Sequence, residues 1–283
     1  SVFVAMSALI KAAGQLPAGQ IVFFRSFFAI LPILAMLAWR HELRTALHTA
    51  NPLGHIDRGV VGVGAMGLGF FALTRLPLPE AITLNYAQPL LVVVFSALFL
   101  GETIRVYRWT AVAVGLVGVV IISWPKLTLF AGEGGMESEQ ALGVAAALVA
   151  AAVSAVAMLL VRRLVQTEKT ATIVLWFSLT ASLMALATLP FGWTALSASQ
   201  AALLVGAGIC GGLAQILMTE SYRYAEASTV APFEYSSMIL GIAVGYLAFG
   251  DLPTIYTIVG GLIVVAAGIF IIWRERQLGL ERG

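Results

Sequence analysis

The stretch Thr170–Thr219 reads TATIVLWFSLTASLMALATLPFGWTALSASQAALLVGAGICGGLAQILMT and contains no charged side chain. A helix that crosses the apolar core of a bilayer, about 30 Å thick, needs about 20 apolar residues. Turn-forming residues interrupt the stretch near its middle, at Pro190-Phe191-Gly192-Trp193. The stretch therefore predicts two membrane-spanning helices joined by a turn.

The composition of the whole chain agrees with this interpretation. Hydrophobic residues make up 60% of the 283 residues, charged residues 11%, and the mean hydropathy is +0.96. Soluble domains are roughly 45–50% apolar and about 25% charged. A chain this poor in charge could not cover a water-facing surface, so we predict an all-α integral membrane protein and not a soluble enzyme. The net charge of +2 gives no indication of a nucleic-acid partner.

The residue types that carry enzymatic or metal chemistry are scarce. Cys210 is the only cysteine, so the chain cannot form an internal disulfide. His41, His48 and His55 are expected together in one polar loop, outside the membrane. We find no metal-ligand cluster and no nucleophile–base pair, so we expect no cofactor and no catalytic residue.

The uncharged runs predict ten spans. Glycine and proline mark the breaks between them, as at Asn51-Pro52 and Gly250-Asp251-Leu252-Pro253. The first apolar run is interpreted as a span and not as a signal peptide, since no basic segment precedes it. A transmembrane barrel would need alternating polar and apolar residues, which are missing. The predicted spans are residues 1–14, 17–39, 57–74, 79–100, 104–123, 139–163, 169–190, 197–222, 226–250 and 253–273.

Lysine and arginine predict the orientation of these spans. Alternating loops place twelve basic residues on the side of the C-terminus and three on the other side, with Arg25 inside a span. Loops rich in lysine and arginine remain cytoplasmic. Both termini are therefore predicted to be cytoplasmic, in a multi-pass protein of the bacterial inner membrane.

The two halves of the chain repeat each other. A shift of 149 residues pairs landmarks at matching points of spans 4–5 and 9–10. Each half has five spans, and an odd number inverts the second half relative to the first, as in many secondary transporters. We expect a first repeat at 1–125, a periplasmic linker at 126–138, an inverted repeat at 139–274 and a cytoplasmic tail at 275–283. The paired landmarks are Tyr86 with Tyr235, Gly101 with Gly250, Glu102 with Asp251, Tyr107 with Tyr256, and Trp124 with Trp273.

The most polar segments at mid-membrane depth fall at symmetric places, around Tyr86 in span 4 and around Tyr235 in span 9. Interrupted helices at matching positions indicate a substrate site. We hypothesise that the two tyrosines face each other across a central cavity, where a phenol could stack on a ring or attract an ammonium group. The alternative is that each tyrosine only ties two helices together. The candidate substrate-binding residues are Asn85, Tyr86, Gln88, Trp176, Gln215, Glu234 and Tyr235, and the structural or coupling candidates are Arg25, Pro89 and Pro232.

Several of these candidates have more than one interpretation. Glu234 would be either a proton or substrate-amine site, or a structural carboxylate with a tyrosine or arginine partner. Arg25 would anchor its helix or act in the site, and Trp176 would face lipid, the core or the substrate.

Motifs in both halves resemble one known family. They are Arg25 in span 2, Phe71-Ala72-Leu73 closing span 3, Gln88-Pro89 followed by Gly101-Glu102 closing span 4, and Gly250-Asp251 in the second half. Their order resembles the drug/metabolite transporter superfamily, EamA-like family, and within it the YddG-type amino acid exporters. The resemblance implies a central cavity between the halves and no ATP-binding domain. Met238 stands where Pro89 would recur, so the halves need not gate identically.

We therefore predict a secondary transporter that exports small amphipathic metabolites by alternating access. Amino acids, aromatic ones included, are the preferred substrates, and we expect a monomer in the lipid bilayer. The alternatives are another solute class, such as drugs or nucleotide-linked sugars, and a channel. Sugar nucleotides would want several basic cavity residues, and only Arg25 is available. A membrane-embedded enzyme is disfavoured by the missing histidine and acid pairs.

Overall fold

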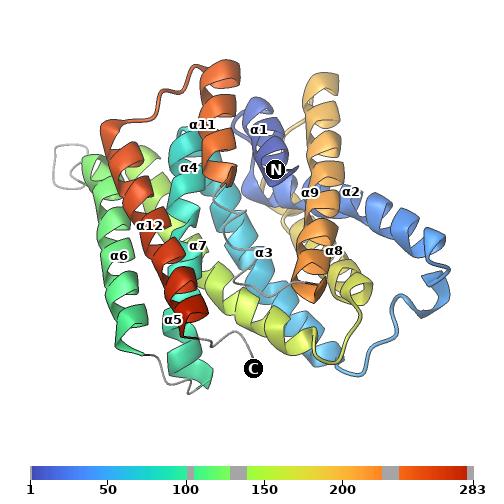
Figure 1. Cartoon of the computed structure of the whole chain (residues 1–283). Helices are drawn as coiled ribbons and strands as arrows, with labels where there is room; N and C mark the ends of the chain where they lie inside the picture. Colours follow the sequence, from blue (N-terminus) through green and yellow to red (C-terminus); the bar gives the residue numbers. More distant parts are fainter. Residues whose placement is uncertain (1, 101–104, 128–138, 225–235, 279–283) are drawn as a thin grey trace.

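All regular secondary structure in the described part of the chain is helical (Figure 1). The structure is a computed structural model, and it describes residues 2–100, 105–127, 139–224 and 236–278. A helix satisfies its own backbone hydrogen bonds, which explains why long apolar runs fold this way in lipid. The all-helical prediction is confirmed. The helices are α1 (Val2–Ala12), α2 (Ala18–Trp39), α3 (Pro52–Arg75), α4 (Leu78–Asn85), α5 (Ala87–Leu100), α6 (Val106–Leu127), α7 (Glu139–Leu164), α8 (Thr170–Leu186), α9 (Ala198–Tyr224), α11 (Ser236–Phe249) and α12 (Ile255–Gln277), with short 3-10 helices η1 (Leu43–Thr45) and η4 (Leu189–Phe191).

Seven stretches of the described chain are long and apolar enough to cross a membrane. Three further helices are apolar but shorter, at Val2–Ala12, Thr170–Leu186 and Ser237–Phe249. The multi-pass prediction is thereby supported, whereas the count of ten crossings stays a prediction. The seven stretches are Ala18–Trp39, Pro52–Arg75, Leu78–Phe99, Val106–Pro125, Glu139–Leu164, Ala198–Ser221 and Ile255–Arg274.

Glycines with positive φ lie at three of the predicted breaks. Gly14 follows α1 with φ of 86°, Gly192 follows η4 with φ of 98°, and Gly250 follows α11 with φ of 69°. This left-handed conformation is unfavourable for residues with a Cβ and commonly ends helices. The charge-free stretch Thr170–Thr219 accordingly divides into α8 and α9 at the predicted turn.

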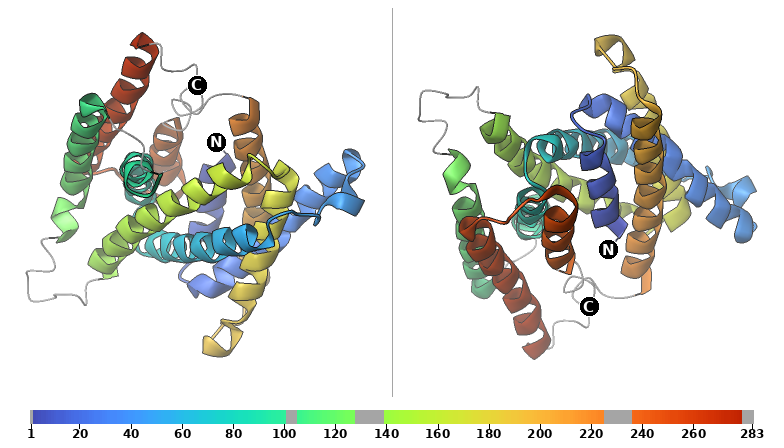
Figure 2. Two further views of the ribbon diagram at one scale, coloured as in Figure 1. Left: turned by 90° about the horizontal axis from the view of Figure 1, so that it is seen from below. Right: turned by 90° about the horizontal axis from the view of Figure 1, so that it is seen from above.

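The helices of the first half pack mainly against helices of the second half. In Figure 2, α6 and α12 lie side by side in both views, and α3 lies beside α7. The other main contacts between the halves join α1 to α9, α2 to α8 and α9, α3 to α8, α5 to α7, and α4 to α11. The two halves therefore interleave and do not form separate bodies.

The crossing of α6 and α12 is made by backbone. A Cβ added to Gly118 would lie 2.7 Å from the carbonyl oxygen of Gly260, and one added to Gly260 would lie 2.5 Å from the carbonyl oxygen of Gly118. Small residues allow this kind of close approach between membrane helices.

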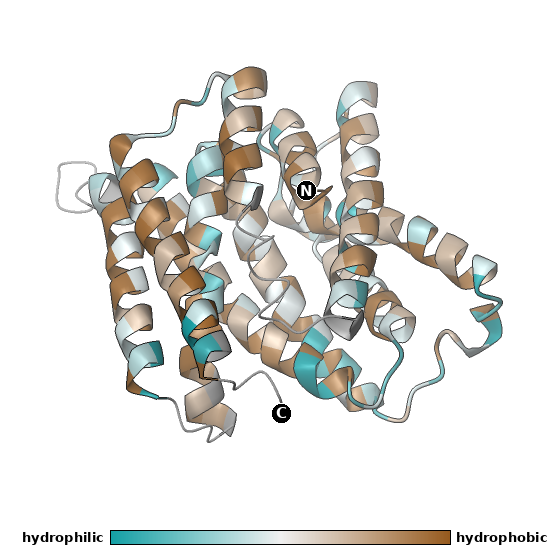
Figure 3. Cartoon of the chain, in the orientation of Figure 1, coloured by the Kyte–Doolittle hydropathy of each residue, from teal (hydrophilic) through white to brown (hydrophobic). Residues whose placement is uncertain are grey.

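Large apolar side chains cover much of the outer surface. Val117 on α6, Leu247 on α11 and Leu262 on α12 are 57%, 82% and 57% exposed. Figure 3 shows apolar residues along the outward-facing ribbons of these helices. So much exposed apolar surface is unfavourable in water, whereas it is compatible with contact to the acyl chains of a bilayer.

Candidate functional site

Two residues that the sequence singles out come together between α2 and α9. Arg25 on α2 is 3% exposed, and its Nη2 lies 3.5 Å from Oε1 of Gln215 on α9, which is a long hydrogen bond. Gly211, one turn before Gln215, leaves space for the guanidinium, because a Cβ there would lie 3.0 Å from Arg25 Nε. Arg25 is therefore held in the protein interior and does not reach the surface of the protein.

A second buried arginine, Arg58 on α3, shares an aromatic partner with Arg25. The Arg58 Cζ lies 3.5 Å from the ring centroid of Phe177 on α8, and the Arg25 Cζ lies 5.8 Å from the same centroid. Arg58 is 7% exposed. We call these two arginines the guanidinium pair. Four helices, α2, α3, α8 and α9, thus meet around two cations and one aromatic ring.

Sequence reasoning missed Arg58 and Phe177 as members of this site. It places the start of the third span at residue 57, which puts Arg58 at the edge of the span, and Arg58 is one of the twelve basic residues assigned to the cytoplasmic side. The helix in fact begins at Pro52, because the Asn51 side chain caps it by accepting a hydrogen bond from Gly54 N at 3.0 Å. The Asn51-Pro52 pair is the signal that places Arg58 well inside the helix and not at its first turn.

The polar segment around Tyr86 interrupts span 4. Helix α4 ends at Asn85 and α5 begins at Ala87, and Pro89 explains the break because it has no N–H for the Asn85 carbonyl. Tyr86 is buried in an apolar cluster that includes Leu90, while Asn85 is exposed and Gln88 and Pro89 are half-buried. The predicted interruption is therefore present in the first half.

The matching segment of the second half lies outside the described residues. It contains Pro232, Glu234 and Tyr235, so the opposition of Tyr86 and Tyr235 across a cavity stays a prediction. The roles of Asn85, Gln88 and Pro89 likewise stay predictions.

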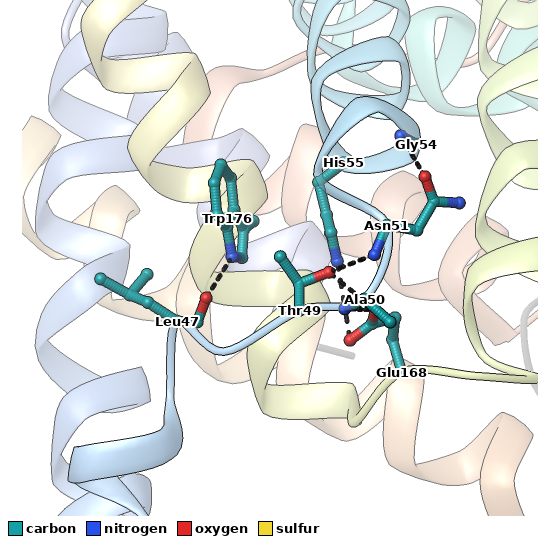
Figure 4. Close-up of polar contacts among 8 residues, drawn as sticks. All are labelled: Leu47, Thr49, Ala50, Asn51, Gly54, His55, Glu168 and Trp176. Atoms are coloured by element: carbon teal, nitrogen blue, oxygen red, sulfur yellow. Dashed lines mark hydrogen bonds and ion pairs between the residues drawn. The ribbon is translucent and has the colours of Figure 1, made fainter.

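Trp176 lies among residues of the loops and helix ends near Glu168 (Figure 4). Its ring stacks on His55 with 5.5 Å between centroids, and its Nε1 donates a hydrogen bond of 3.3 Å to Leu47 O. The expectation that all three histidines lie in one loop is wrong for His55, because this residue belongs to α3 and is 1% exposed. The substrate-binding role of Trp176 stays a prediction.

Glu168 joins the α7–α8 loop to the segment before α3. Its Oε1 accepts hydrogen bonds from Thr49 Oγ1 at 2.7 Å and from Ala50 N at 2.9 Å, and its Oε2 lies 3.9 Å from His55 Nε2. Burial acts to raise the pKa of Glu168, but these hydrogen bonds and the nearby imidazole outweigh burial and hold the pKa below its ordinary value of 4.5.

We expect Glu168→Gln to lower the free energy of unfolding at pH 7 by on the order of 1 kcal/mol, because an amide accepts weaker hydrogen bonds than a carboxylate. Since the folded pKa is lowered, the carboxylate contributes its stability above about pH 4.5 and loses it as the pH falls through the lowered pKa. The difference in melting temperature between the two proteins in detergent should therefore close in acid. Asp57→Asn, at an exposed carboxylate of α3, is the control and should change the melting temperature little at pH 7. A difference that persists undiminished at about pH 3 would contradict the assignment.

A second polar junction joins α1, the α3–α4 corner and α11. Lys11 Nζ lies 2.9 Å from Asp251 Oδ2 and donates a hydrogen bond of 2.8 Å to Leu76 O. The same carboxylate oxygen accepts a hydrogen bond of 3.0 Å from Leu78 N. Lys11 also lies over the ring of Phe249 at 5.5 Å. We call this group the Lys11–Asp251 junction; it fastens three segments that are far apart in the sequence.

Comparison with known proteins identifies the relatives of this chain. A family model described as the EamA-like transporter family matches residues 1–124 and 141–274. A pseudopaline exporter of Pseudomonas aeruginosa is 30% identical over 276 residues, which cover 94% of this chain and 90% of that protein.

Other relatives are named for other solutes. An S-adenosylmethionine uptake transporter of Rickettsia prowazekii is 24% identical, covering 91% of this chain and 84% of the relative. A riboflavin transporter of Vibrio cholerae is 31% identical, covering 89% and 81%. A crystal structure of a protein with 22% identity matches 98% of this chain and 96% of its own with a TM-score of 0.68, which is a likeness of fold.

Proposed function

The chain belongs to the EamA-like transporter family, and from this premise we propose that it exports small amphipathic metabolites, amino acids and aromatic amino acids among them, by alternating access. It is a multi-pass membrane protein that transports a small molecule and is not an enzyme, as its family and the names of its relatives agree. The export direction is supported by the name of the Pseudomonas relative. We further propose the bacterial inner membrane as its location.

The pattern of helix contacts is the observation that carries the proposal. Exchanging each helix of the first half with its counterpart in the second converts the α3–α7 contact into the α9–α1 contact, and the α2–α9 contact into the α8–α3 contact. The contacts α2–α8 and α6–α12 each join two counterparts, and the α5–α7 contact is converted into the α11–α1 contact. Two related halves that interleave in this way can exchange conformations and expose one site to either side.

The proposed topology follows from this arrangement. We propose that residues 1–125 and 139–274 are inverted five-helix repeats, joined by a periplasmic linker at 126–138 and followed by a cytoplasmic tail. The two ranges matched by the family model support this division. The Lys11–Asp251 junction then closes the periplasmic end. An arrangement closed at one end at a time is what distinguishes a transporter from a channel.

Counterflow in proteoliposomes tests the proposed function. Vesicles loaded with unlabelled substrate should accumulate labelled substrate transiently above its equilibrium level, because a carrier exchanges one molecule for another. The panel comprises L-phenylalanine, L-leucine, riboflavin, S-adenosylmethionine and a uridine-diphosphate sugar. We expect the overshoot with L-phenylalanine and L-leucine, and none in protein-free vesicles. Equilibration without an overshoot would indicate a channel, and an overshoot only with a non-amino-acid would correct the substrate class.

A further inference from the structure

The guanidinium pair holds two positive charges in the interior of the bundle. Arg25 and Arg58 come from neighbouring helices, are 3% and 7% exposed, and lie over the ring of one residue, Phe177. Two glycines leave space for the guanidinium groups, because neither glycine has a Cβ. A Cβ at Gly62 would lie 2.6 Å from Arg58 Nη1, and one at Gly211 would lie 3.0 Å from Arg25 Nε.

No carboxylate in the described part of the chain neutralises these charges. The ion pairs described there all involve other cations, at Lys11, Arg40, His55, Arg75 and Lys169. Burying a charge without a partner is unfavourable, and two like charges that share one ring also repel each other. The face of an aromatic ring compensates this only in part. The interior therefore favours an additional anion at this place.

The donors that remain are suited to an oxyanion. Nε and Nη1 of both arginines are buried and have no hydrogen-bond partner among the described residues. The guanidinium is a planar fork of N–H donors that matches the two oxygens of a carboxylate. Gln215 adds an amide on the Arg25 side of the pair. The site therefore offers charge and donors but no acidic group of its own among the described residues.

We propose that the guanidinium pair binds the carboxylate of the transported metabolite. The inference rests on the proposed transport function and names the substrate class, which is small metabolites with a free carboxylate. Both guanidinium groups are buried, so the carboxylate reaches them when the packing of α2, α3, α8 and α9 opens during the transport cycle. Phe177 positions the two cations, and Gln215 restricts Arg25.

Ligand-induced stabilisation of the purified protein in detergent tests the site without transport. The four probes share a phenyl ring: L-phenylalanine, 3-phenylpropionate, 2-phenylethylamine and phenyl phosphate. For wild type, 2-phenylethylamine should need at least about tenfold more ligand than 3-phenylpropionate for half-maximal stabilisation, because charge-assisted bidentate bonds are lost. Arg25→Gln and Arg58→Gln should each abolish most of this preference. Arg44→Gln, at an exposed arginine of η1, should retain it.

Several results would overturn the inference. If the wild-type protein bound 2-phenylethylamine as tightly as 3-phenylpropionate, the inference would be wrong. This test needs no variant, so it still decides the question if the glutamine variants fail to fold. If phenyl phosphate bound more tightly than 3-phenylpropionate, the group that the site recognises would be a phosphate and not a carboxylate. Glu234→Gln and Arg58→Gln can also be compared with their double variant. If the two single variants lower the melting temperature equally, the double variant lowers it no further, and neither single variant changes the ligand preference, then a carboxylate of the protein itself occupies the guanidinium pair.

Ligand-induced stabilisation and counterflow together distinguish a failure of this inference from a failure of the proposed function. Counterflow without a preference for carboxylates would leave the transport function standing and remove the site. If the protein showed an arginine-dependent preference for carboxylates but no counterflow with any panel member, the carboxylate site would stand and the transport proposal would be wrong.

Discussion

Gly118→Ala and Gly260→Ala should each lower the free energy of unfolding by about 1–3 kcal/mol, the usual range for overpacking a tightly packed interface. The added Cβ would lie 2.7 or 2.5 Å from a carbonyl oxygen of the facing helix. A backbone oxygen cannot rotate away as a side chain can, so α6 and α12 must move apart along their crossing. Unfolding by titration of a denaturing detergent into mild micelles measures the change.

The matched control is Gly67→Ala, in the interior of α3. A Cβ there would meet nothing within 4 Å, so the same substitution should be neutral or stabilising by at most about 1 kcal/mol. Opposite signs at the two kinds of position would establish the backbone crossing. If Gly118→Ala stabilised the protein as much as Gly67→Ala, the two helices would be farther apart than described here.

Asp251→Ala should destabilise the protein by roughly 1.5–3 kcal/mol, the range for hydrogen bonds to charged groups. The substitution removes the carboxylate that Lys11 approaches at 2.9 Å and the acceptor of the Leu78 N–H. Both side chains of the ion pair are about four-fifths buried, so water replaces the lost partner poorly. The control is Lys169→Ala, which breaks an exposed pair with Glu42 and should cost no more than about 1 kcal/mol.

A double-mutant cycle separates the ion pair from the other contacts of Asp251. Lys11→Met removes the cation and keeps an apolar stem, and the double variant should lose less stability than the sum of the two single losses. Strict additivity would mean that the two charges contribute independently, and the Lys11–Asp251 junction would then not be a coupled unit.

The sequence predicts where helices lie but not which of them meet. The apolar runs and the glycines at Gly14, Gly192 and Gly250 place the helices, because bilayer thickness and backbone hydrogen bonding leave little choice. Arg25 and Gln215 were both recognised as candidates, yet their contact spans 190 residues and has no local signature. Lys11 and Asp251 are a similar case.

One detail of the candidate site shows a different limit, that of a boundary set by charge. A span drawn to begin at residue 57 places Arg58 at the membrane surface, although the cap at Asn51 starts the helix earlier. The break at Tyr86 inside the span 79–100, by contrast, is predicted from the sequence, because Pro89 removes the hydrogen bond that would have kept the helix continuous there. In both cases local capping and proline chemistry, and not hydropathy, decide the backbone.

The unequal lengths of two consecutive helices, α7 and α8, affect the lipid around the protein. Helix α7 has 26 residues and is about 39 Å long, whereas α8 has 17 residues and is about 26 Å long, at about 1.5 Å per residue. A hydrocarbon layer of about 30 Å is too thin for an upright α7 and too thick for an upright α8. Helix α7 can tilt or extend its polar ends, at Glu139 and at Arg162-Arg163, beyond the hydrocarbon layer, whereas beside α8 the bilayer thins or flanking side chains snorkel. We therefore expect the acyl-chain length of the surrounding lipid to influence the angle between α7 and α8.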